Sequence, residues 1–302
     1  MDLLHLSSEA TEALKNQFKT SQLVVPSPND RLVELYKRTD NKTHQQIYEF
    51  LTIKSFGLTD DNQKKISIMS EIYKVLSRKN NFLEKWSSSS EWTLIIKLWS
   101  RIFETLFEDT IINLVWGDTK NDTFKVDLRL CLEFKKKMYD ISNIEFKKNG
   151  NGPGLIKKDG AKVLNEGKAI LNSLIEEYNF DFEEAKNKKV IVGQICGLKA
   201  VFSELRLAAP GCYMPSQFGR TIKYPYNGQR AKGFSSGGLE QLFCYKNAIV
   251  KEANMLKNTL VKDSSEFGSQ STIADKYFLK QCYIIPDKAV KWPKVNDDFY
   301  KS

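Results

Sequence analysis

The period of the hydrophobic pattern changes just after residue 107, and this change limits the folds open to the chain. Between Trp92 and Phe107 apolar side chains recur every three or four residues, which predicts a long amphipathic helix. We expect the whole stripe to pack against a sheet. Its members are Trp92, Ile95, Ile96, Trp99, Ile102, Phe103, Leu106 and Phe107. Residues 124–130 then alternate strictly between apolar and polar, which is typical of a strand with one buried face.

Further strands and helices are expected on either side of this alternating segment. A short apolar strand, 112–116, precedes it, with a turn at 117–119, and a third strand covers 141–148. A helix over 159–178 leads to two strands within 190–207, which turn at Gly197, and a loop-rich stretch precedes a helix over 239–260. The predicted order is α-β-β-β-α-β, an α/β (α+β) fold with a mixed central sheet.

Charge and rare residues narrow the function. Lys and Arg outnumber Asp and Glu by 46 to 37, giving a net charge of +9, which favours a polyanionic partner or serves solubility alone. The five cysteines are widely spaced, which argues against a disulfide framework and a structural zinc site. Both histidines, His5 and His44, lie far from the predicted sheet, which argues against histidine-based catalysis. The chemistry is therefore expected to use carboxylates, lysines and an oxygen-preferring metal.

Two segments of the predicted hairpin read E-x-K, and strand geometry separates them. Glu133 follows Asp127 by six residues, roughly 20 Å along one strand, so these two carboxylates cannot share a metal. With a turn near Lys136, cross-strand partners sum to 272, and Asp127 falls opposite Glu145, with Cβ atoms about 5 Å apart. A Mg²⁺ or Mn²⁺ ion would relieve the repulsion between them. Lys147 lies on the same face as Glu145; an ordinary exposed face of alternating charges remains the alternative.

Residues 90–207 resemble the restriction-endonuclease-like core of the PD-(D/E)xK nuclease superfamily, with Asp on the second strand and E-x-K on the third. The resemblance implies that Asp127 and Glu145 bind Mg²⁺ or Mn²⁺ and that Lys147 assists hydrolysis of a phosphodiester. Val126 stands where the family motif has proline. Many members carry an acidic residue in the first core helix, which Glu104 or Glu108 could match. More loosely, the chain is similar in style to nuclease-like domains of crinkler-type and transposon-associated proteins.

Nucleic acid, DNA in preference to RNA, is the expected partner. Residues 205–239 contain no acidic side chain and interleave basic residues with aromatic ones, although a flexible basic loop with buried aromatics would look the same. Asp118, which follows the first predicted strand, is a further candidate metal ligand. Gln194, on the fourth predicted strand, is a candidate to reach the same site. The candidate contacts to nucleic acid are Lys125, Arg129, Lys148, Lys168, Arg206, Arg220, Lys223, Arg230 and Lys232.

The chain divides into three expected regions: a helical accessory region (1–85), the nuclease-like domain (86–262) and a tail packed on the core (263–302). With neither a signal peptide nor a membrane span, we expect an intracellular protein of the nucleus or cytoplasm. Cutting both strands of a duplex would favour a homodimer. Two alternatives to a metal-dependent nuclease stay open: a nuclease fold that binds nucleic acid without cutting it, and a protein-interaction domain whose basic charge serves solubility.

Overall fold

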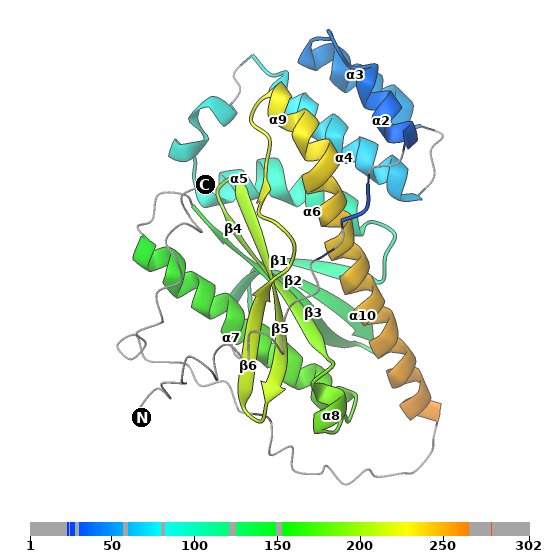
Figure 1. The fold of residues 1–302 in the computed structure, drawn as a ribbon, viewed down its shortest axis with the longest axis vertical. Helices are drawn as coiled ribbons and strands as arrows, with labels where there is room; N and C mark the ends of the chain where they lie inside the picture. Colours follow the sequence, from blue (N-terminus) through cyan, green and yellow to red (C-terminus); the bar gives the residue numbers. More distant parts are fainter. Residues whose placement is uncertain are drawn as a thin grey trace, which may run out of the picture.

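A computed structural model describes residues 23, 25–27, 30–56, 60–79, 82–120, 125–148, 153–265 and 279. These residues form a mixed α/β structure built on one seven-stranded sheet with helices on both faces (Figure 1). No helix in the described part is long and apolar enough to cross a membrane. The mixed sheet and its flanking helices confirm the predicted α/β class.

The first helices of the described part lie together at one end of the molecule (Figure 1). They are α2 (Asp30–Lys37), α3 (His44–Ser55) and α4 (Asp60–Leu76), and α3 packs against α4. Thr43 caps α3 through a capping box with Gln46, which satisfies backbone N–H groups that the helix leaves unpaired. Buried residues of α3 and α4 join the same hydrophobic cluster as those of the sheet, so one core runs through both parts. The predicted boundary at residue 85 stays a prediction.

The strands lie side by side in chain order, from β1 to β6, and β7 pairs with β5. Only β3 and β4 run parallel; the other pairs are antiparallel. The strands are β1 (Ile112–Lys120), β2 (Lys125–Phe134), β3 (Lys137–Lys147), β4 (Lys189–Cys196), β5 (Lys199–Ala209), β6 (Cys212–Gln217) and β7 (Ile222–Lys223). The predicted turn at Gly197 between β4 and β5 is confirmed, with a positive φ of 58° that glycine adopts readily.

Two long helices cover the opposite faces of the sheet (Figure 1). Helix α7 (Pro153–Glu177), continued by α8 (Phe182–Ala185), connects the parallel strands β3 and β4, as such a crossover requires. At Gly167, an added Cβ would lie 3.0 Å from a methyl group of Val192, so glycine lets α7 approach the sheet closely. On the other face, α10 (Leu239–Ser265) places the ring of Tyr245 against Phe202. The Tyr245 hydroxyl group forms a hydrogen bond with the Ser142 hydroxyl group.

The helix before the sheet corrects one expectation. It consists of α5 (Glu91–Leu94), a π-helical turn η2 (Ile95–Trp99) and α6 (Ser100–Phe107). Its buried side chains recur every four residues, a longer period than the 3.6 of an α-helix, and the wider π turn keeps them on one face. They are Leu94, Ile95, Leu98, Trp99, Ile102, Phe103, Leu106 and Phe107. Trp92 and Ile96, predicted to be buried, are 49% and 61% exposed.

Other boundaries also differ from those predicted. The predicted turn at 117–119 is instead an irregularity within β1, where Gly117 has a φ of 98° and the register with β2 shifts. Much of the predicted loop before residue 238 is regular structure: β6, β7, α9 (Gly228–Gly233) and a second π-helical turn, η3 (Phe234–Gly238). The backbone of this stretch pairs with β5, a long-range contact that short-range patterns do not reveal.

The π turn predicts opposite outcomes for two neighbouring isoleucines. Ile95→Ala should lower the free energy of unfolding by about 2–5 kcal/mol, because Ile95 is 2% exposed and its loss leaves a cavity. Ile96→Ala should change the free energy by no more than about 0.5 kcal/mol. Urea titrations followed by circular dichroism measure both. Equal losses for the two variants would show that the helix does not bury Ile95 and expose Ile96 in this way.

Candidate functional site

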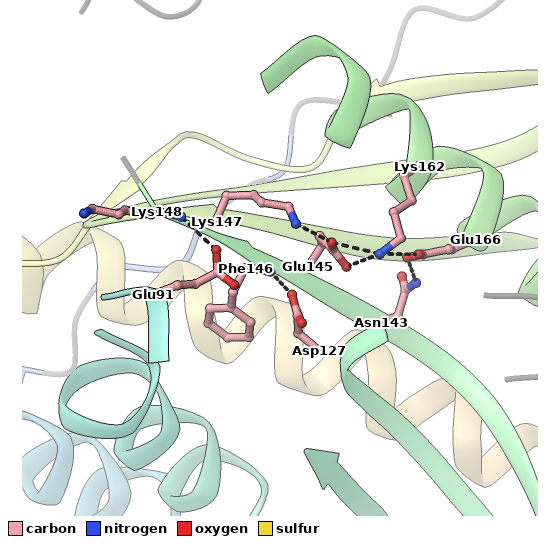
Figure 2. A network of polar contacts seen from close by, with 9 residues as sticks. All are labelled: Glu91, Asp127, Asn143, Glu145, Phe146, Lys147, Lys148, Lys162 and Glu166. Carbon is pink, nitrogen blue, oxygen red and sulfur yellow. Dashed lines mark hydrogen bonds and ion pairs between the residues drawn. The ribbon is translucent and has the colours of Figure 1, made fainter. Parts of the chain in front are cut away.

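The β2–β3 hairpin brings two of the predicted site residues together. Its two-residue turn at Lys135 and Lys136 has positive φ at both positions, the conformation of a type I′ turn. A bulge then shifts the register, so that Leu128, Arg129 and Leu130 pair with Ile144, Asn143 and Ser142, the predicted sum of 272. The ladder ends at Leu128. One residue further, the Asp127 side chain accepts a hydrogen bond from the Phe146 N–H at 2.8 Å (Figure 2).

Glu145 lies at the centre of a network of charged groups between β3 and α7 (Figure 2). Its side chain is only 2% exposed, and two lysines neutralise it. Lys162 of α7 lies 2.8 Å from each carboxylate oxygen, and Lys147, two residues along β3, lies 3.0 Å from Oε1. Burial opposes the charge of Lys162, but its hydrogen bonds and attraction to Glu145 outweigh this effect, so its pKa lies above the ordinary lysine value.

A second carboxyl group lies behind Lys162, one helical turn along α7. Glu166 is fully buried, and its Oε2 accepts a 2.5 Å hydrogen bond from Asn143 Nδ2. Lys162 Nζ lies 3.4 Å from Oε1, within ion-pair range, although this oxygen accepts no hydrogen bond. Burial raises the pKa of Glu166 to about 8, against the opposing charge of Lys162, and Glu145 adds to the rise. Glu166 therefore holds a proton at neutral pH more readily than an exposed glutamate.

Burial also raises the pKa of Asp127, to about 6, and the charge of Glu145 contributes to the rise. The Phe146 N–H and Lys147 act in the opposite direction, because both favour the ionised carboxylate. Asp127, Glu145 and Lys147 are thus close enough to influence one another, as the sequence predicted.

The acidic residue of the preceding helix that faces this network is Glu91. Its carboxylate accepts a 3.0 Å hydrogen bond from the Lys148 N–H, and its charge further raises the pKa of Asp127. The predicted candidate, Glu104, instead accepts a hydrogen bond from Trp116 Nε1 at 2.6 Å. Glu104 and Glu108 line a separate hollow of about 420 Å³ beside the edge strand β1. In this arrangement the Glu104 carboxylate contacts Trp116, and its role as a metal ligand stays a prediction.

A divalent cation would fit the donors on the hairpin. Mg²⁺ is commonly held by one or two carboxylates, with water and substrate phosphates filling the other positions. Asp127 and Glu145 supply two carboxylates, and Gln194 on the neighbouring strand β4 is paired with Glu145. Within the described ranges, no group of three or more His, Cys, Asp or Glu side chains is arranged to hold a metal. The fit therefore depends on the two hairpin carboxylates.

Some predicted contacts to nucleic acid are engaged within the protein. Arg129 forms a 2.8 Å ion pair with Asp140, and both side chains are 15% exposed. Lys168, predicted to reach the network from α7, instead lies over the Tyr213 ring at 4.8 Å, and Lys162 takes the predicted place. Lys232 pairs with Asp40.

The other predicted contacts do not form one surface. Arg206 is half-buried near the far end of β5, roughly 23 Å along the strand from Lys199, which pairs with Lys223. Arg220, Lys223 and Lys148 are exposed, and Arg230 lies over the Tyr226 ring at 4.5 Å. Three of the five interleaved aromatic residues, Phe218, Tyr224 and Phe234, are buried and therefore cannot stack on bases. The side chains of Lys125 and Asp118 and residues 149–152 lie outside the described part.

Lys162 and Glu166 were missed from the sequence, although a signal was present. Glu166 interrupts the apolar face of α7, between the buried Val163 and Ile170. A carboxyl group at a core position requires a buried partner. Lys162, four residues earlier, is on the same face of the helix and supplies part of that partnership.

Comparisons of the chain with protein-family models, with curated proteins and with solved structures found no match. The case for a function therefore depends on the residues of the site.

The raised pKa of Glu166 predicts a specific pH dependence. Between about pH 5 and 8 the unfolded chain releases the proton of this glutamate while the folded chain keeps it, so its contribution to stability falls as pH rises. Glu166→Gln removes the titrating group. The free energy of unfolding of the variant, relative to that of the native protein, should therefore rise over this interval by an amount on the order of a few kcal/mol.

Urea titrations at several pH values measure this difference. The slope of this difference against pH is the relevant quantity. Its absolute value is not, because the substitution also changes the contacts with Asn143 and Lys162 at every pH. Parallel curves for the two proteins would contradict a raised pKa at Glu166.

Proposed function

We propose that the protein is a metal-dependent nuclease of the PD-(D/E)xK type, with a restriction-endonuclease-like core, that hydrolyses phosphodiester bonds in DNA or RNA. The observation that carries the proposal is the clustering of Asp127, Glu145 and Lys147 at the end of one hairpin. The order of elements from α5 to β4 also agrees with α-β-β-β-α-β, with Asp127 on the second strand and the E-x-K segment on the third.

Each residue has a role that follows from its position. Asp127 and Glu145 would hold a Mg²⁺ or Mn²⁺ ion, which supplies Lewis acidity to the phosphate and lowers the pKa of a bound water. Lys147 lies on the same face as Glu145, where its ammonium group can stabilise charge that develops on the phosphate oxygens. Lys162, on α7, gives the site a second ammonium group on the side of Glu145 that faces this helix.

Lys162 also favours a second candidate, a fold that binds nucleic acid without cutting it. Its ammonium group contacts both oxygens of Glu145, the group to which a metal ion must bind. A cation would have to compete with this lysine for the carboxylate. If Lys162 wins the competition, the protein keeps its excess of positive charge but binds no metal ion at Glu145.

The two E-x-K segments provide a matched test of the proposal. Glu145→Gln should lower the rate of cleavage of labelled DNA or RNA in Mg²⁺ or Mn²⁺ by at least about 100-fold, because the metal loses a charged ligand. Glu133→Gln makes the same change in the other segment, where Glu133 is exposed near the hairpin turn, and should leave the rate unchanged.

Assays in EDTA and thermal unfolding of each variant provide the controls. Cleavage that persists in EDTA, or that survives Glu145→Gln, would contradict the proposal. Salt-sensitive binding without cleavage under any metal would favour the second candidate.

Competition between Lys162 and a cation predicts a metal-dependent gain in stability. Lys162→Met should lower stability without metal by about 2 kcal/mol, less than the loss of a fully buried pair, because the Lys162 side chain is 34% exposed. Mn²⁺ should then raise the melting temperature of the variant more than that of the native protein, since the ion no longer competes with an ammonium group.

Thermal unfolding over a range of Mn²⁺ concentrations measures both effects. Adding Glu145→Gln to the variant should abolish the extra gain. Equal responses of Lys162→Met and the native protein would show that the ion does not bind where Lys162 lies.

A further inference from the structure

Three lysines form a row across one end of the sheet. Lys147 on β3 pairs with Cys196 on β4, Cys196 pairs with Lys199 on β5, and Lys199 pairs with Lys223 on β7. Paired residues on neighbouring strands point to the same face of a sheet. The three lysines therefore share the face on which Glu145 meets α7, and they span three strand spacings, roughly 14 Å.

The outer two members of this lysine row are exposed to solvent. Lys199 and Lys223 are both exposed, whereas Lys147 is 25% exposed and contacts Glu145. The row begins at the proposed scissile phosphate and leads away from it, over the end of the sheet where the β4–β5 turn lies. Lys199 lies outside the acid-free stretch, so the basic character of residues 205–239 did not reveal it.

We infer that the lysine row is the track for the phosphates of one polynucleotide strand, which runs from Lys147 over Lys199 to Lys223. This inference rests on the proposed function and adds the substrate class: a strand of several nucleotides, since a mononucleotide would reach only one end of the row. Lysine suits this role because its ammonium group binds phosphate without regard to base sequence. Arg206, near the far end of β5, and Lys232, paired with Asp40, lie outside the track.

The salt dependence of binding tests the row directly. Each phosphate contact contributes about 0.7 to the slope of log affinity against log salt for a single strand, and about 0.9 for a duplex. Lys199→Ala/Lys223→Ala should therefore lower the slope by about 1.4 on oligodeoxythymidine, or by about 1.8 if the track holds one strand of a duplex. Fluorescence anisotropy in EDTA measures binding without cleavage, and thymidine monophosphate should compete weakly.

A matched control removes the same charge elsewhere. Lys251 and Lys257 are exposed on α10, which covers the opposite face of the sheet, so Lys251→Ala/Lys257→Ala should leave the slope unchanged. Equal slopes for the two double variants would overturn the inference, as would strong competition by thymidine monophosphate. The proposed function fails separately: it falls if the native protein does not cut nucleic acid with Mg²⁺ or Mn²⁺, and it survives if such cleavage persists while the two double variants bind with equal slopes.

Discussion

The buried carboxylate of Glu145 is the constraint on which the site depends. A carboxylate with 2% exposure is costly to keep ionised unless a cation accompanies it, and Lys162 supplies that cation from α7. The ion pair therefore couples the crossover helix to the middle strand of the sheet. Gly167 contributes to this arrangement because its lack of a side chain lets α7 lie close to Val192 on β4.

The hairpin could be predicted because its information is local. Residues 124–130 alternate in polarity, and the short turn that follows predicts an antiparallel hairpin. The register was less secure, because the two-residue turn alone pairs residues that sum to 271 and would place Asp127 opposite Ile144. The bulge between Leu130 and Cys131 shifts the register by one residue, so the predicted sum of 272 is found beyond it although the sequence did not reveal the bulge.

The contribution of α7 could not be placed in the same way, because the contact of Lys162 with Glu145 spans 17 residues and depends on how the helix docks. Two other differences have physical causes. Trp92 and Ile96 are exposed because a π turn changes the phase of an otherwise regular stripe. The aromatic residues after residue 205 are largely buried because their segment adds strands to the sheet instead of forming an open loop.

The π turn from Ile95 to Trp99 also gives the helix a tolerance for one change in chain length. Its residues advance by less than the roughly 100° per residue of an α-helix, so the turn takes up one extra residue without rotating the segments on either side of it. Deleting one exposed residue of this turn, such as Ile96, would leave a regular α-helix whose two halves keep their relative orientation. Glu91 would then still face the Lys148 N–H while Ile102 to Phe107 stay packed in the core.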